Sequence, residues 1–134
     1  MEISCFDDLL QAARQQREPQ RLLLVFAGAS LPADASAEQR ERVAAGESGE
    51  LAPLMCVDKD PHELASFDAL AAEAAAAGPP WALVFAAALS GRQGQPPSAS
   101  QVDAALQSLV EAVRGGDFDR LIPFDRSGGA VRLG

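Results

Sequence analysis

Three stretches of the chain are apolar on both of their alternating faces and are bounded by polar residues, glycine or proline. They cover residues 21–27, 51–57 and 81–89. Strands have this pattern when helices cover both faces of their sheet, as is usual for parallel sheets. The pattern therefore predicts three central, buried strands. Because Pro53 cannot donate a hydrogen bond to a neighbouring strand, the second strand is expected to begin near Leu54 or to lie near an edge.

Apolar residues at helical spacing alternate with these strands. The first such stripe consists of Phe6, Leu9, Leu10 and Ala13. Capping residues at the starts, and glycine or proline at the ends, set the limits of the helices. For the last helix, either Ser98 with Gln101 or Ser100 with Asp103 supplies the cap. We predict helices over about 4–16, 37–45, 60–77 and 98–114, the third ended by Gly78 in the left-handed conformation.

The C-terminal part of the chain has the pattern of a hairpin. Residues 121–124 and 130–133 are short apolar segments on either side of Ser127-Gly128-Gly129, and Pro123 fits an edge strand. Strands that alternate with amphipathic helices predict right-handed crossovers and a mainly parallel sheet. We therefore predict one α/β domain over residues 1–134, in three layers. Its mainly parallel sheet has three central strands, and a C-terminal antiparallel hairpin follows.

Charge and hydropathy argue against several classes of partner. The net charge of −8 repels nucleic-acid phosphates and anionic lipids, and the arginines do not cluster. The N-terminus lacks the basic start and apolar run of a secretory signal. The longest apolar run, 81–89, is much shorter than the ~20 residues that span a bilayer. We expect a cytoplasmic protein in which Cys5 and Cys56 stay reduced, with neither a membrane nor a nucleic acid as partner.

The best candidate for a binding site is the edge where the carboxyl ends of the three predicted strands would meet. Ligands bind at this edge in open parallel sheets. The loops that follow the strands cover residues 28–30, 58–63 and 90–94. Backbone N–H groups and Arg92 there could bind a phosphate- or nucleotide-like anion. The candidate ligand-binding residues are Ser30, Asp58, Asp60, His62, Ser90, Gly91 and Arg92.

Other kinds of chemistry have less support. Asp58, Asp60 and His62 are suitable metal donors, but Asp60 fits a helix cap better, so we predict no metal site. The loop at 90–94 lacks the Gly-Lys-Ser/Thr of a phosphate-binding loop and also fits a solvent loop. The chain has no Cys-x-x-Cys and no Gly-x-Ser-x-Gly, and Cys56 is expected to be inert packing in a strand. We therefore name no catalytic residue and no cofactor.

Two functions remain. The first is a non-catalytic binding, adaptor or regulatory domain that binds another protein. The acidic composition favours it, and the edge of the C-terminal hairpin could pair with a partner or with a second copy of the chain. The alternative is a domain that binds a small anion, or a weak enzyme, using the edge where the strands end. Of binding and catalysis, catalysis is the less favoured function.

Five stretches are spread over nearly the whole chain, at residues 5–10, 24–29, 53–59, 84–91 and 122–125. Together they resemble a small family of uncharacterised bacterial proteins. Members of that family often carry the name ribonucleotide reductase subunit alpha. A large subunit of ribonucleotide reductase resembles a large α/β barrel with a radical-forming cysteine and a second redox pair. This chain is several times too short for such a barrel, so we interpret the name as a misannotation, and the resemblance implies no catalytic residues.

Overall fold

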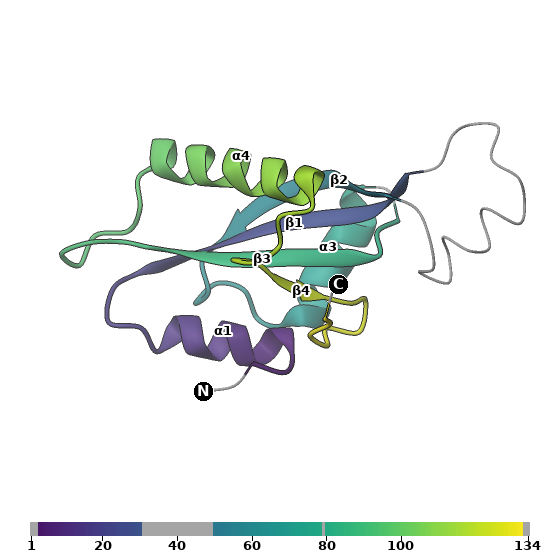
Figure 1. Cartoon of the computed structure of the whole chain (residues 1–134). Coiled ribbons are helices and arrows are strands. Elements are labelled where there is room, and N and C mark those ends of the chain that lie inside the picture. Colours follow the sequence, from purple (N-terminus) through teal and green to yellow (C-terminus); the bar gives the residue numbers. More distant parts are fainter. Residues whose placement is uncertain (1–2, 31–49, 79, 133–134) are drawn as a thin grey trace, which may run out of the picture.

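The computed structural model describes residues 3–30, 50–78 and 80–132, and at 29, 30, 50 and 51 it describes the backbone alone. The helix predicted at 37–45 lies outside the described residues. Four strands form one sheet in the order β2-β1-β3-β4 (Figure 1). The elements in chain order are α1 (Phe6–Arg14), β1 (Gln20–Ser30), β2 (Glu50–Lys59), α3 (Phe67–Ala77), β3 (Leu83–Ser90), α4 (Ala99–Gly115) and β4 (Ile122–Phe124).

The sheet is antiparallel, so the prediction of a mainly parallel sheet is wrong. Every pair of neighbouring strands runs in opposite directions. The end of β1 lies beside the start of β2, because Ser30 pairs with Glu50. β2 and β3 do run in the same direction and α3 connects them, but β1 lies between them. A strand covered by helices on both faces is apolar on both faces in either type of sheet, so its pattern does not reveal its direction.

Helices cover both faces of the sheet, as predicted. Figure 1 shows α4 above the sheet and α1 below it, and α3 packs on the same face as α1. The even-numbered residues of β1 contact α1 and α3, whereas the odd-numbered residues contact α4. The residues from Leu22 to Ala27 are at most 3% exposed. The two-sided burial predicted for this segment is therefore confirmed.

A cluster of aromatic rings joins α1, α3 and the C-terminal part of the chain. The ring centroid of Phe6 lies 5.5 Å from that of Phe67 and 5.4 Å from that of Phe124. The backbone N–H of Phe6 donates to the carbonyl oxygen of Gly128 at 2.7 Å. Gly128 has a φ of 90°, and a Cβ there would lie 2.9 Å from the Phe67 ring. Glycine is therefore required at this turn both by its backbone conformation and by the close approach of the ring.

Some of the helix ends predicted from the sequence are confirmed, and others are wrong. The capping box of Ser98 and Gln101 is confirmed at the start of α4. The first helix begins slightly later than predicted: its N-cap residue is Cys5, and the N–H and hydroxyl of Ser4 donate to Asp8. α3 begins only at Phe67, since the residues from Asp60 onward form a separate turn. Gly78 is extended and not left-handed, because the residue before a proline favours the extended region.

The predicted C-terminal hairpin is short and irregular. Only β4 is a regular strand, and it pairs with β3. The returning segment bridges Phe124 with Ala130, and the N–H of Val131 donates to the carbonyl of Pro123 at 3.0 Å. The carboxylate of Asp125 closes the turn by accepting from the Ser127 N–H at 2.9 Å and from its hydroxyl at 2.6 Å. The outer side of β4 is therefore partly bonded to the chain itself.

Replacement of the central aromatic ring should destabilise the whole fold. We expect Phe6→Ala to lower the free energy of unfolding by about 3 to 5 kcal/mol, because the ring is fully buried between Phe67 and Phe124. Urea denaturation measures the change, and Gln11→Ala, at an exposed position of the same helix, is the matched control. Equal midpoints for the two variants would contradict this packing.

The turn at Asp125 should make stability depend on pH. Hydrogen bonds from the Ser127 hydroxyl and from backbone N–H groups lower the pKa of Asp125 from its ordinary value of 3.8. The ionised carboxylate therefore contributes stability above pH 3.8, which is lost as the pH falls through the lower pKa of the folded state. Asp125→Asn should be less stable than the native protein at neutral pH, and the difference should vanish in strong acid. Thermal unfolding of both proteins over a pH series checks this; a difference that persists in strong acid contradicts it.

Candidate functional site

The antiparallel sheet separates the predicted site residues into two groups. Ser30 pairs with Glu50 at one end of the sheet. At the other end Gln20 pairs with Ser90, and Leu22 pairs with Lys59. The expected single edge with all three loops is therefore wrong. The residues at 58–62 and at 90–92 still share one end of the sheet, because β2 and β3 run in the same direction.

Most polar groups at this shared end bind one another. The Nε of Arg21 donates to the Oδ2 of Asp58 at 2.6 Å, and the Nε2 of Gln20 donates to the hydroxyl of Ser90 at 3.0 Å. The carboxylate of Asp60 accepts from the backbone N–H of His62 at 2.8 Å, and the His62 side chain is exposed. Within the described ranges, no three His, Cys, Asp or Glu side chains are grouped for a metal ion.

The loop after β3 is a tight turn whose outward N–H already has a partner. Arg92 and Gln95 exchange two backbone hydrogen bonds, and the positive φ of Gln93 and Gly94 is that of a type I′ turn. The N–H of Gly94 donates to the Oε2 of Glu18 at 2.9 Å. A carboxylate of the chain therefore occupies the place that an anion would take. Gly91 is required by packing, because a Cβ there would lie 1.9 Å from the carbonyl oxygen of Gln95.

A hollow of about 650 Å³ lies on the α4 side of the sheet, away from the predicted edge. We call it the α4/β3 groove. Its walls are α4 and the segment 117–121, and its floor is the second half of β3 with Leu23 of β1. The lining is mainly aliphatic, with polar groups at the rim: it comprises Leu23, Ala87, Ala88, Leu89, Ala105, Ser108, Leu109, Ala112, Asp117, Asp119, Arg120 and Leu121.

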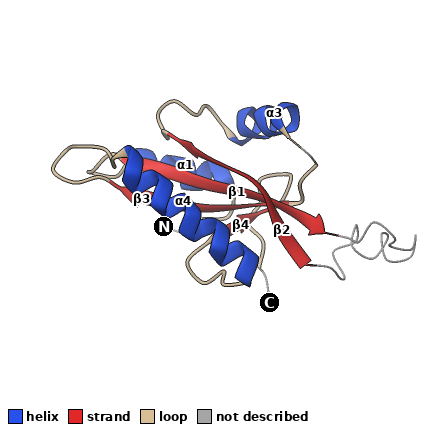
Figure 2. Cartoon of the chain, turned by 90° about the horizontal axis from the view of Figure 1, so that it is seen from above, coloured by secondary structure: helices blue, strands red, loops and turns tan. Residues whose placement is uncertain are grey.

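The position of α4 and its small side chains leave this groove open. Figure 2 shows α4 lying across the sheet, and it packs mainly against β1 and β2, with less contact to β3. Ala105 and Ala112 of α4 line the groove together with Ala87 of β3. A single methyl group at each of these positions leaves space that a larger side chain would fill.

The end of α4 places the charged residues at the rim. The N–H of Asp117 donates to the carbonyl of Ala112 at 2.9 Å, and Gly116 has a φ of 75°, which together form a Schellman ending. Phe118 then stacks on Phe85 with ring centroids 4.9 Å apart and fixes the segment to the sheet. As a result, Asp117, Asp119 and Arg120 are exposed beside an apolar floor.

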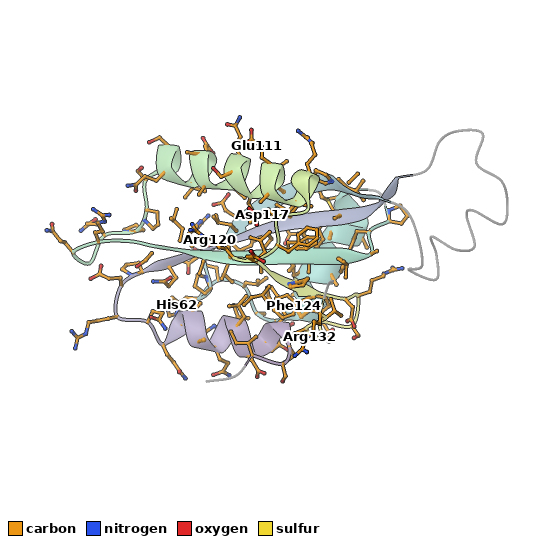
Figure 3. The ribbon with its side chains drawn as sticks, in the orientation of Figure 1. His62, Glu111, Asp117, Arg120, Phe124 and Arg132 are labelled. Carbon is orange, nitrogen blue, oxygen red and sulfur yellow. The ribbon has the colours of Figure 1, made fainter. Side chains whose placement is uncertain are left out.

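None of the predicted site residues lines this groove. Figure 3 shows Asp117 and Arg120 in the space between α4 and the sheet, whereas His62 lies beside α1 on the other face. The sequence contained one signal for the groove: Ala105, Leu109 and Ala112 share a helix face at which two of the three side chains are small. The prediction that Cys56 is buried is also wrong, because its side chain is exposed.

Comparisons with protein-family models, with curated proteins and with solved structures find no match to this chain. The resemblance to the bacterial family described above therefore stays a prediction. No described helix is both long enough and apolar enough to cross a membrane.

Inorganic phosphate should not bind at the turn after β3. We expect phosphate and chloride, at equal ionic strength, to change the melting temperature of the native protein by the same amount, because Glu18 already accepts from Gly94. The substitution Arg92→Ala should leave this result unchanged. Differential scanning fluorimetry of both proteins measures this. Stabilisation by phosphate that the substitution removes would show that an anion does bind there.

Proposed function

We propose that this chain is a protein-binding domain and that the α4/β3 groove receives an apolar segment of a basic partner protein. The observation that carries the proposal is an open, aliphatic hollow of about 650 Å³ with Asp117 and Asp119 at its rim. Apolar surface that a partner buries there contributes about 25 cal/mol per Å² to the free energy of association.

The chemistry of the lining favours binding over catalysis. Its described side chains are mostly alanine and leucine, and none is histidine, cysteine or lysine. Ser108 is a possible nucleophile and Asp117 and Asp119 are possible bases, but among the described side chains no hydrogen bond joins the Ser108 hydroxyl to either carboxylate. Both carboxylates are exposed at the rim, where water solvates them.

The charge of the chain indicates the sign of the partner. The net charge is −8, and Asp117 and Asp119 form no ion pair with another described residue. Arg120 at the same rim offsets one of these two charges, so the long-range attraction of a cationic partner comes mainly from the net charge of the chain. Basic residues beside an apolar segment would lie near the two carboxylates.

The outer edges of the sheet are less suited to binding a partner than the groove is. β4 is three residues long, contains Pro123, and is partly bonded to Val131 on its outer side. β2 contains Pro53, and the register shifts there so that Leu54 has no partner in β1. Proline and a bulge both hinder the pairing of an edge with another strand. The hairpin edge that we considered first as a partner surface is therefore not the one we propose.

The alternative of an anion-binding domain has less support. Its site would be the shared end of β2 and β3, where Asp58 is bonded to Arg21 and Glu18 to Gly94. A smaller hollow of about 320 Å³ at this end contains that same Arg21–Asp58 pair, together with Asp103. Its arginine is thus already neutralised by a carboxylate.

Selection of peptides from a random library displayed on phage, with the full chain as bait, tests the proposal. We expect the enriched peptides to combine apolar residues with lysine or arginine. Ala105→Leu fills the groove and should weaken the binding of a synthetic, fluorescently labelled selected peptide about tenfold or more, which corresponds to ~1.4 kcal/mol. Fluorescence anisotropy measures the affinity.

Matched variants on the same helix control this experiment. Ala104→Leu, at an exposed position that does not line the groove, should leave the affinity unchanged. The double variant Asp117→Asn with Asp119→Asn should slow association and reduce its dependence on salt, whereas Glu111→Gln, on the outer side of α4 (Figure 3), should not. Failure to enrich any peptide, or equal affinity for Ala105→Leu and the native protein, would overturn the proposed function.

A further inference from the structure

Part of β3 has an edge without a partner, and this edge borders the α4/β3 groove. On one side, β3 pairs with β1 along the whole length of β3, from Gln20↔Ser90 to Ala27↔Leu83. On the opposite side, β4 pairs only with the residues from Val84 to Ala86. The remaining segment of β3, residues 87–90, has no strand on that side among the described parts of the chain.

The register shows which backbone groups face this free edge. The N–H of Gly91 donates to the carbonyl of Pro19 at 2.7 Å, which extends the β1–β3 register by one residue. In an antiparallel ladder, alternate residues direct both their N–H and C=O groups to the same side. The odd-numbered residues of β3 therefore bond to β1, and the groups of Ala88 and Ser90 point away from it.

The pairing with β4 independently gives the same orientation. Phe85, an odd-numbered residue, lies opposite Pro123, which has no N–H to donate. This is the position in the ladder at which no hydrogen bond is required. The backbone of Ala88 is thus oriented like that of Ala86, which pairs with Ile122 of β4, but Ala88 lies beyond the end of β4.

The free edge and the groove are parts of one surface. Ala88 lines the groove and is exposed, and Arg120 lines the same hollow. Ala87 and Leu89 face α4, so they form the floor next to that edge. In a strand added here, alternate side chains would point to the α4 side and enter the groove.

We propose that the partner binds as a short extended strand, added to β3 in line with β4 and antiparallel to β3. The strand exchanges backbone hydrogen bonds with Ala88, inserts an apolar side chain between α4 and the segment 117–121, and places basic residues near Asp117 and Asp119. Added strands obtain affinity from backbone hydrogen bonds and specificity from pockets for alternate side chains. This inference rests on the proposed function, because the same groove receives the side chain.

Two experiments with the tightest selected peptide test this mode of binding. Ala88→Pro removes only an N–H that points away from β1, so the fold should tolerate it, as edge strands tolerate proline. We expect this variant to weaken binding about tenfold or more, whereas Ala99→Pro, at the exposed first position of α4 and outside the groove, should bind like the native protein, because proline is favoured at the start of a helix. Circular dichroism verifies that both variants are folded.

Methylation of peptide nitrogens, one position at a time, tests the same idea on the native protein, even if Ala88→Pro fails to fold. An added strand predicts loss of binding at every second position, because only alternate N–H groups of the peptide donate to β3. Loss without this alternation, or full binding by folded Ala88→Pro while Ala105→Leu does not bind, overturns strand addition but leaves the groove as the site. Failure to enrich any peptide, or undiminished binding to Ala105→Leu, overturns both.

Discussion

Strand β1 has no free side, and the position of every other element depends on it. Both of its edges are bonded, to β2 and β3, and its residues from Leu22 to Ala27 are buried on both faces. α1 and α3 cover one face, and α4 covers the other. Because β1 runs opposite to both neighbours, the end of β2 and the end of β3 meet at one end of the sheet. The same reversal sends Ser30 to the opposite end.

The groove exists because coverage of the sheet is uneven. Among the described residues, α4 is the one helix on this side of the sheet, and it lies mainly over β1 and β2. β3 therefore has an aliphatic surface that α4 only partly covers, and alanines at the boundary leave room for a guest side chain. Phe118 anchors the second wall by stacking on Phe85. The hydrophobic packing that stabilises the fold thus also sets the shape of the candidate binding surface.

A protein-binding role is consistent with where polar groups are paired within the chain and where they are left exposed. At the shared end of β2 and β3, carboxylates, an arginine and backbone N–H groups bind one another. At the groove, by contrast, Asp117 and Asp119 stay exposed beside apolar surface, and the edge of β3 beyond β4 keeps backbone groups of Ala88 directed outward. Surfaces that combine apolar area, exposed carboxylates and an open strand edge are suited to extended peptide segments.

The sequence by itself determined the approximate positions of β1, β2, β3, α1 and α4, that β1 is buried on both faces, and that Ser98 caps α4. These features depend on local periodicity and capping chemistry. Only the tertiary structure decided the directions of the strands, and with them which loops meet. Direction depends on pairing between distant segments, and a strand covered on both faces has the same apolar pattern in either direction. The groove is likewise a product of tertiary packing, since alanines such as Ala105 form a cavity only where the facing strand is left partly uncovered.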